Sequence, residues 1–569
     1  MKQLATFLIA TATAICVNGE TRPNVLFVSV DDLNNWISCL GGHPQTKTPN
    51  FDRLAASGVL FKNAYCPAAS CNPSRTAIMT GIPPHVSGVY RNGQKMREIL
   101  PNAEIMPKYF SHNGYWSAGS GKILHYFIDA NSWDDYFPDK AKENPFPRTL
   151  YPKERPVNLP RGGPWQYVET DWGGLDATDE EFGGDWLVTN WVGEQLRRKH
   201  TKPFFLACGL YRPHEPWFVP QKYFDLFPLD ELQMPLGLKE DDLADIPPVG
   251  QRLGRNRYLA HIKKHDQWRQ GVQGYLASIA FADAMLGRVL DALESGPNKS
   301  NTIVVLWSDH GWHLGEKEHW QKFTGWRVCA RVPLMIRVPM GAPGLPSGTQ
   351  LGAVCNRPVS LQSLFLTLNE LCGLPKKAEV VGPSLVPLLR DPNADWPHSA
   401  LTQLDQAQNY AISNERWRYI HYTDGGEELY DIKSDPHEWT NLAGRAESAA
   451  RLKSFRESAP KEFNEESKTG SGPMPKNLWH AAGDSPPPHS KPTGGPFTAS
   501  FHNQRWEPVR VFWVSPTGER VQYGEIGATS DRGQSTRHGA VWVFTNSAGK
   551  DLGHVVIRSR QKRYDIPAE

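Results

Sequence analysis

Residues 24–32 read Asn-Val-Leu-Phe-Val-Ser-Val-Asp-Asp, and this stretch decides the fold. Its apolar residues do not alternate with polar ones, which is typical of a strand buried on both faces. Similar runs occur at residues 203–209 and 302–307, and each of the three runs leads into polar residues. The sequence therefore predicts a buried sheet whose strands end in polar groups.

Helical patterns separate the predicted strands, at residues 50–57, 74–80, 106–113 and 270–293. Strands that alternate with helices predict an α/β fold with a mostly parallel sheet flanked by helices. Such sheets bind ligands beyond the carboxyl ends of their strands. The pairs Asp31-Asp32 and Asp309-His310 and residues 211–214 all fall at these ends, so we expect the functional site there.

The rest of the chain divides into three parts. Short alternating runs between residues 411 and 442 predict a small antiparallel sheet, in a subdomain of about residues 375–465 that completes a catalytic domain of residues 22–465. Residues 466–496 are rich in Pro, Gly, Ser and Lys, a composition typical of an extended linker. Short β-like runs over residues 497–560 predict a small all-β sandwich domain.

The N-terminus predicts export. Lys2 precedes an apolar run over residues 4–17, which is the pattern of a secretory signal peptide, here residues 1–19. We therefore expect a periplasmic, extracellular or lysosome-like location. No later run reaches about 18 apolar residues, so no membrane span is expected. A formal net charge of +2 gives no indication of nucleic acid binding.

The sequence contains eight cysteines and does not decide whether they form disulfides. Cys16 lies in the predicted signal peptide and Cys71 in a segment with its own chemistry, which leaves six. Six cysteines in an exported protein allow 15 disulfide pairings, which the sequence cannot distinguish, and buried thiols are the alternative.

Two residue pairs and one cysteine are candidate site residues on their own chemistry. Asp31-Asp32 offers hard oxygen ligands for Ca²⁺ or Mg²⁺, and Asp309-His310 could join them if both strands belong to one sheet. This mixed set of oxygen and imidazole ligands does not exclude Zn²⁺. Cys71 lies at the start of a helical pattern, where the helix N-terminus lowers a thiol pKa and stabilises anions. Acidic residues that end a strand, and a buried cysteine that starts a helix, are the structural alternatives.

The segment Cys71-Asn72-Pro73-Ser74-Arg75, followed by Thr80-Gly81, resembles the signature of the type I sulfatases, whose cysteine is oxidised to Cα-formylglycine. Ile78 departs mildly from the usual Leu or Phe. Further similar blocks occur over residues 23–445, including 48–55, 121–125, 308–311 and 429–431. Several of these blocks look most similar to iduronate-2-sulfatase and its bacterial relatives. The resemblance implies the alkaline-phosphatase-like sulfatase fold.

The resemblance also implies roles for individual residues. A Ca²⁺ ion would be held by Asp31, Asp32, Asp309, His310 and the modified Cys71. Arg75 would anchor the formylglycine, and the sulfate would be surrounded by Lys122, His125, His214 and Lys322. The formylglycine hydrate would attack sulfur with one hydroxyl, while His214, together with Lys322, protonates the departing sugar oxygen. His125 would then deprotonate the second hydroxyl, which expels sulfate.

The implied partners are a sulfated, uronate-containing saccharide as substrate and a formylglycine-generating enzyme during maturation. Two other functions stay open. One is a phosphatase or phosphodiesterase of the same superfamily, because phosphate and sulfate are nearly isosteric. The other is a non-catalytic scaffold that binds glycans or proteins.

Residues 499–553 resemble the β domain of the von Hippel-Lindau protein, through Tyr523 and Trp542 among others. The resemblance implies a β-sandwich with a protein ligand, in the best-known case one containing hydroxyproline. Ala540 stands where that pocket has His, and Thr536 replaces a Ser. A glycan ligand, or a packing role for the domain, are the alternatives.

Overall fold

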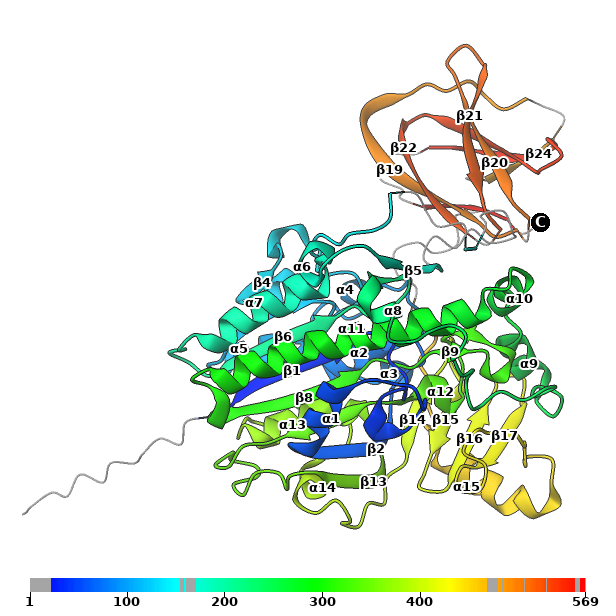
Figure 1. The fold of residues 1–569 in the computed structure, drawn as a ribbon. Helices are drawn as coiled ribbons and strands as arrows, with labels where there is room; N and C mark the ends of the chain where they lie inside the picture. The colour runs from blue at the N-terminus through cyan, green and yellow to red at the C-terminus, as the bar shows by residue number, and fades with distance from the viewer. Residues whose placement is uncertain are drawn as a thin grey trace, which may run out of the picture.

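The computed structural model describes residues 22–153, 158–159, 170–467, 479–483, 486–505, 507–528, 530–557 and 563–567 (Figure 1). The predicted signal peptide, residues 1–19, lies outside these residues. Within the described part of the chain, no helix combines the length and the apolar character needed to cross a bilayer.

A nine-stranded sheet forms the centre of the larger unit. Its strand order is β11 (Arg331–Val332), β2 (Val59–Tyr65), β12 (Leu334–Arg337), β8 (Thr302–Ser308), β1 (Asn24–Val30), β6 (Phe204–Leu210), β3 (Trp116–Gly121) and β4 (Asp135–Phe137), with β13 (Ala353–Ser360) paired to β2. The five strands from β8 to β4 run parallel, whereas β12 is antiparallel to both of its neighbours. The predicted mostly parallel α/β sheet is confirmed.

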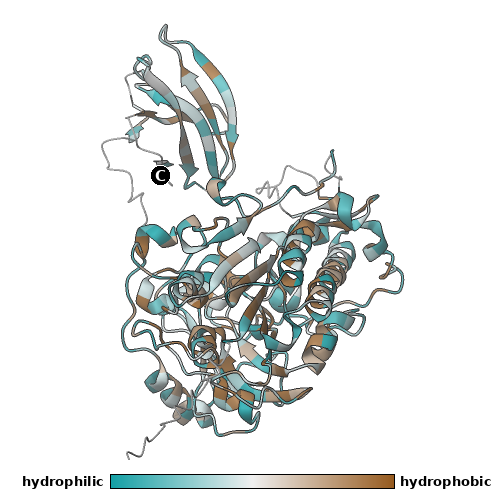
Figure 2. Ribbon diagram, turned by 90° about the vertical axis from the view of Figure 1, so that its left-hand side faces the viewer, coloured by the Kyte–Doolittle hydropathy of each residue, from teal (hydrophilic) through white to brown (hydrophobic). Residues whose placement is uncertain are grey.

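The central strand β1 is buried on both faces, as its unbroken apolar run predicts. Val25 and Phe27 pack in one hydrophobic cluster, whereas Leu26, Val28 and Val30 pack in another on the opposite face. Burial of each large apolar side chain contributes about 1.5–3 kcal/mol, so neither face favours a polar residue. In Figure 2 the hydrophobic residues gather between the sheet and its helices.

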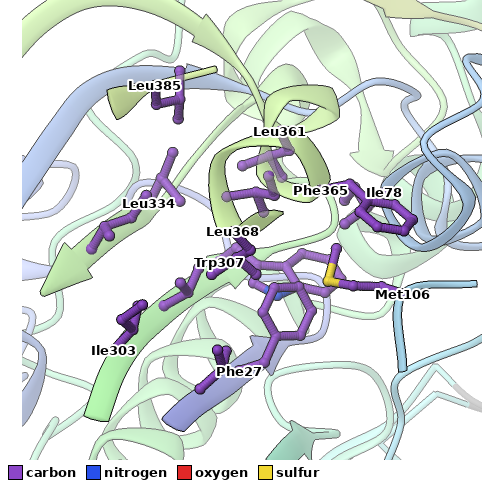
Figure 3. Packing of buried hydrophobic residues seen from close by; sticks show 14 of the residues in the cluster. Phe27, Ile78, Met106, Ile303, Trp307, Leu334, Leu361, Phe365, Leu368 and Leu385 are labelled. Carbon is purple, nitrogen blue, oxygen red and sulfur yellow. The ribbon is translucent and has the colours of Figure 1, made fainter. Parts of the chain in front are cut away.

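Helices cover both faces of the sheet. One face packs on α2 (Cys71–Thr80), α5 (Met106–His112), α13 (Leu364–Leu371) and α14 (Val386–Arg390). Figure 3 shows Phe27 and Trp307 on this face, with Phe365 and Leu368 of α13 close by. The other face packs on α1 (Pro49–Ala56), α7 (Asp185–Arg197) and α11 (Trp268–Ser295). The predicted helices lie within three residues of these bounds.

The predicted small antiparallel sheet follows the large one in the chain. It has the order β14 (Ala400–Gln403), β15 (Tyr410–Ser413), β16 (Trp417–His421) and β17 (Glu427–Asp431). All three of its strand pairings are antiparallel. Helix α15 (Ala449–Ser458) packs on this sheet through Leu452 and Phe455.

The C-terminal unit is an all-β sandwich, drawn in orange and red in Figure 1. One sheet consists of β18 (Trp479–Ala481), β24 (Asp551–Val556), β23 (Val541–Thr545), β20 (Val509–Val514) and β21 (Arg520–Ile526). The other consists of β22 (Asp531–His538), β19 (Thr493–Asn503) and β25 (Arg563–Ile566). Phe501 and Tyr564 of the second sheet pack against Trp542 and Phe544 of the first.

The predicted boundaries of this unit are wrong at both ends. β18 and the start of β19 lie inside the predicted linker of residues 466–496, and β25 lies beyond residue 560. The composition of the predicted linker gave no indication of β18. The three residues of this strand pair with β24, and Trp479 packs on Phe544. The start of the C-terminal unit thus depends on hydrogen bonds to a strand distant in sequence, which local composition cannot predict.

The cysteines are thiols. All seven cysteines in the described part of the chain are free, and every one except Cys39 is buried. The buried-thiol alternative is therefore correct for all of these cysteines except Cys39, and none of the disulfide pairings is present among these seven.

Candidate active site

The candidate site forms where several elements end at one edge of the large sheet. Asp31 and Asp32 follow β1, and Asp309 and His310 follow its parallel neighbour β8. Lys122 follows β3, and residues 211–214 follow β6. Because the carboxyl ends of neighbouring parallel strands share one edge, residues 277 positions apart in the chain come into contact: the Asp32 N–H donates to Asp309 Oδ1 at 3.1 Å.

Cys71 is the first residue of α2, and the N-terminus of this helix faces the carboxylates. Its Sγ lies 3.1 Å from His310 Nε2 and 3.1 Å from Lys322 Nζ. Lys122 Nζ and Asp32 Oδ1 are each 3.8 Å away. The structure carries the unmodified thiol, so Sγ marks the place that an oxygen of a formylglycine hydrate would take.

The electrostatic surroundings of the Cys71 thiol are dominated by cations. Burial by itself raises the pKa of Cys71, but Lys122, Lys322 and His310 outweigh it, so that the pKa is lowered. An atom in this position therefore carries negative charge more readily than it would in water.

Arg75 ties the ends of β1 and β8 to α2. Its side chain is fully buried and forms ion pairs with Asp31 Oδ1 at 2.9 Å and with Asp309 Oδ2 at 2.8 Å. It also donates to the backbone oxygens of Lys122 at 2.7 Å and Ile123 at 3.0 Å. Arg75 therefore fixes the carboxylates and the start of the Lys122 loop relative to the helix that carries Cys71.

Three buried carboxylates meet at this edge, and the pKa values of two of them, Asp31 and Asp32, shift in opposite directions. Burial raises the pKa of Asp31, but Lys122 and Arg75 overcome this and hold it well below its usual value. Burial raises the pKa of Asp32 to about 8, because the negative charges of Cys71 and Asp31 add to the effect and Lys322 offsets only part of it. The positive charge near Asp32 thus only partly offsets the cost of burying its carboxylate.

The residues present fit a bound divalent cation. Ligand atoms of Asp32, Cys71, Asp309 and His310 all lie within 4.8 Å of one another and are buried, and Asp31 joins Asp32 in a second such group with His214. A set rich in carboxylate oxygens suits Ca²⁺. An ion there would supply the positive charge that Asp32 lacks.

Hydrogen bonds fix the orientation of two histidines. His310 Nδ1 lies 3.0 Å from the Gly311 backbone oxygen, and His214 Nδ1 lies 2.6 Å from that of Glu215. A carbonyl oxygen only accepts, so Nδ1 carries the proton in both rings and Nε2 faces the site. His310 Nε2 is thereby available to a metal, as second-shell hydrogen bonds commonly arrange.

The remaining predicted residues surround the same space. Lys322 Nζ donates to Asp32 Oδ1 at 2.9 Å, Lys122 Nζ forms an ion pair with Asp31, and His214 Nε2 lies 3.7 Å from Asp32 Oδ2. Burial and the charges of Lys122 and Lys322 hold the pKa of His125 well below its usual value. His125 Nδ1 is buried and has no hydrogen-bond partner in the described part of the chain.

The structure adds residues that sequence reasoning missed. Ser74 Oγ donates to the Asp309 backbone oxygen at 2.6 Å, which ties α2 to the end of β8. The Tyr126 ring lies 4.6 Å from Lys122 Nζ, and the Trp312 ring lies 5.3 Å from Lys322 Nζ. The sequence indicates these two aromatic residues only through their positions: Tyr126 directly follows His125, and Trp312 lies in the segment after His310.

Comparison with known families shows to which family the chain belongs. The family model described as Sulfatase matches residues 23–374, which is more than half of the chain. The chain belongs to the sulfatase family. A second model, described as N-sulphoglucosamine sulphohydrolase, C-terminal, matches residues 315–462 of the sulfatase and covers its small antiparallel sheet.

Individual relatives agree with this assignment. The sulfatase is 39% identical over 450 residues to a protein named Sulfatase from Formosa agariphila, a match that covers 77% of this chain and 87% of the relative. It is 31% identical over 450 residues to iduronate 2-sulfatase from Mus musculus, covering 71% and 78%.

Solved structures share the fold. One structure, determined in complex with its substrate D-glucosamine-2-N,6-O-disulfate, matches with a TM-score of 0.59 and 23% identity, over 77% of this chain and 96% of the other. A phosphonate monoester hydrolase from Agrobacterium radiobacter matches with a TM-score of 0.63 and 22% identity, over 77% and 94%. At this level of identity the likeness concerns the fold alone. The predicted fold class is thus confirmed.

Calcium is expected to stabilise the sulfatase against heat. A ligand at a hundredfold excess over its Kd stabilises the folded state by about 2.7 kcal/mol, which raises the melting temperature. Thermal unfolding of the chelator-treated protein, with and without added Ca²⁺, measures this increment. Asp309→Asn should remove the increment, whereas Glu447→Gln, at a side chain 74% exposed, should keep it. An equal increment in both variants would place the ion elsewhere.

Proposed function

We propose that this sulfatase hydrolyses sulfate esters of saccharides, with residue 71, after its conversion to Cα-formylglycine, as the nucleophile. The observation that carries the proposal is the position of Cys71 Sγ, 3.1 Å from both His310 Nε2 and Lys322 Nζ at the N-terminus of α2. Charged groups on several sides converge on the one atom that the modification would replace with oxygen.

The chain's own residues account for binding of the sulfate group. Lys122 and Lys322 are buried, and interaction with the carboxylates raises the pKa of both, even though burial lowers it, so they stay cationic. Two cations held in a water-poor site stabilise the charge that develops on the sulfate oxygens in the transition state. When a Ca²⁺ ion is bound by Asp31, Asp32, Asp309, His310 and residue 71, it adds Lewis-acid polarisation of the same oxygens.

Proton transfers complete the proposed reaction. One hydroxyl of the hydrated residue 71 gives its proton to the Asp32 carboxylate, whose Oδ1 lies 3.8 Å from Cys71 Sγ, and forms a bond to sulfur, while the sulfur–oxygen bond to the sugar breaks. Lys322 Nζ, which stays cationic, or His214 once its Nε2 carries a second proton, gives a proton to the departing sugar oxygen. His125 then takes the proton of the second hydroxyl, the carbonyl forms again, and sulfate leaves. Water restores the hydrate.

The relatives support a sulfated saccharide as the substrate class. Relatives of this chain include iduronate 2-sulfatase and the N-acetylglucosamine-6-O-sulfatase of Bacteroides thetaiotaomicron, which is 25% identical over 520 residues. The proposal that the saccharide contains a uronate rests on the similarity to iduronate 2-sulfatase alone. A formylglycine-generating enzyme and an exported location complete the proposal, and the C-terminal sandwich is proposed to bind a protein or glycan ligand.

Parallel assays with 4-methylumbelliferyl sulfate and the matching phosphate test the proposed function. We expect the sulfate ester to be hydrolysed and the phosphate ester to stay near background. The competing phosphatase function would give the reverse order, and a non-catalytic scaffold would hydrolyse neither ester.

A further inference from the structure

A cavity of about 220 Å³ lies beside Lys122, and the proposed reaction does not use it. Most of its walls are aromatic or aliphatic: Tyr126, Phe146, Tyr151, Phe182, Val188 and Tyr211. Part of its floor is the backbone of Gly121 and Gly209, at the ends of β3 and β6. Pockets for drug-sized ligands measure about 300–1,000 Å³, so this cavity fits a single ring-sized group.

The cavity adjoins the reacting groups through two tyrosines. Lys122 Nζ lies 4.6 Å from the centre of the Tyr126 ring and 5.5 Å from that of Tyr211. The Tyr211 ring stacks on His214, with 4.8 Å between centroids and 27° between planes. The Tyr211 ring therefore contacts both the cavity and the proposed proton donor.

The aromatic wall is held by contacts among its own rings. Phe146 lies 5.4 Å from the Tyr126 ring and 5.2 Å from the Tyr211 ring, with the latter edge-on. Rings supported in this way present large, rigid surface at small entropic cost. Such a wall suits the apolar face of a sugar ring.

One buried polar group of the cavity is an acceptor. Asp185 is only 3% exposed and accepts the backbone N–H groups of Tyr211 at 2.8 Å and Arg212 at 2.9 Å, one on each carboxylate oxygen. An ionised carboxylate has about four acceptor sites, so Asp185 can accept further hydrogen bonds. Burial raises its pKa to about 6.

The cation next to Asp185 is already occupied. Arg212 Nε and one terminal nitrogen donate to the Phe218 backbone oxygen at 3.3 and 3.2 Å, and the other terminal nitrogen donates to that of His214 at 3.3 Å. Against the effect of burial, the charge of Arg212 lowers the pKa of Asp185, so these two side chains offset each other, and Lys122, another described cation of the cavity wall, forms an ion pair with Asp31. The guanidinium thus supports the loop after β6.

We propose that this cavity is the subsite for an uncharged, hydroxyl-bearing sugar ring of the sulfated substrate, which lies against Phe146 and donates a hydroxyl to Asp185. A uronate ring would place a second carboxylate beside Asp185, and in the described part of the chain both cations that line the cavity, Lys122 and Arg212, already have partners. Unpaired buried charges are costly. The inference rests on the proposed function and narrows its substrate to neutral sugars at this position.

Binding to the inactive Cys71→Ala protein tests the subsite without turnover. Glucose 3-sulfate and glucuronate 3-sulfate differ only at C6, so calorimetric titration with each isolates the effect of the carboxylate. We expect glucose 3-sulfate to bind about tenfold more tightly, and Phe146→Ala in the same background to weaken its binding about tenfold, in the range that loss of a specific pocket contact gives. Leu150→Ala, at a side chain 42% exposed in the same loop and outside the cavity, should leave binding unchanged.

Asp185→Asn should reduce the difference between the affinities for glucose 3-sulfate and glucuronate 3-sulfate. Melting curves check that each variant is folded. Because this variant also disturbs two backbone hydrogen bonds, Phe146→Ala gives the independent test. Equal or tighter binding of glucuronate 3-sulfate, failure of both esters to bind, or unchanged binding in Phe146→Ala would overturn the subsite. Hydrolysis of 4-methylumbelliferyl sulfate by the unmutated protein is scored separately, so failure of the proposed function is distinguishable.

Discussion

Cys71→Ala is expected to abolish sulfate release. Alanine cannot be converted to an aldehyde, and loss of a covalent nucleophile in other hydrolases lowers kcat by about 10⁶-fold. The two lysines and the helix N-terminus that surround residue 71 would remain, so binding of the sulfate group should persist. Sulfate release from 4-methylumbelliferyl sulfate measures the loss, and calorimetry measures the retained binding.

Two further experiments separate this outcome from a general loss of folding. Cys372→Ala removes another fully buried thiol, in the hydrophobic core, and should leave activity in place. Cys71→Ser should be active only in a host whose maturation enzyme accepts serine. Mass spectrometry of the tryptic peptide of residues 63–75 reports the modification directly, and an active protein that carries only unmodified Cys71 would refute the mechanism.

His214→Ala is expected to lower turnover of a sugar sulfate by about 10²- to 10⁴-fold, the usual contribution of a general acid. The same variant should lose much less on 4-nitrophenyl sulfate, because nitrophenolate leaves without taking a proton. The expectation concerns the imidazolium form of His214. Its Nδ1 donates to the Glu215 backbone oxygen, so the proton to be transferred is a second one, on Nε2, which faces Asp32 at 3.7 Å.

The ratio of the two losses is the informative quantity. The matched control is His112→Ala, at a side chain 59% exposed, which should leave the turnover of both substrates unchanged. Equal losses on the two esters would assign His214 to binding of the sulfate group, and the proton would then have to come from Lys322, whose Nζ is 3.1 Å from Cys71 Sγ.

The fold of the catalytic unit could be read from the sequence because its strands are buried on both faces. β1 covers the apolar part, residues 24–30, of the stretch at residues 24–32, and β6 and β8 lie within one residue of their predicted bounds. The convergence of Asp31-Asp32 with Asp309-His310 follows from the parallel pairing of β1 with β8. Composition and periodicity therefore suffice where local pattern and tertiary burial coincide.

Other parts depend on contacts between distant residues, and local pattern fails there. Lys322 follows β10 (Trp320–Gln321), a strand too short to have a period, and only the family resemblance indicated it. Asp185 starts α7 and looks like an ordinary first-turn acid in sequence, but the backbone after β6 folds onto it. β18 lies in a Pro-rich segment and exists only because β24 pairs with it.

The ion pairs of Arg75 bear on how inactive variants of this enzyme have to be judged. In many enzymes polar site residues are held at a cost in stability, so that their removal makes the protein more robust. Here one guanidinium links the two central strands to the helix that carries the nucleophile, and its removal leaves two buried carboxylates without that partner. Breaking buried pairs in this way costs about 3–5 kcal/mol. A substitution of Arg75 would therefore lower both the activity and the stability of the fold. Laboratory evolution could not gain stability at this position by giving up activity.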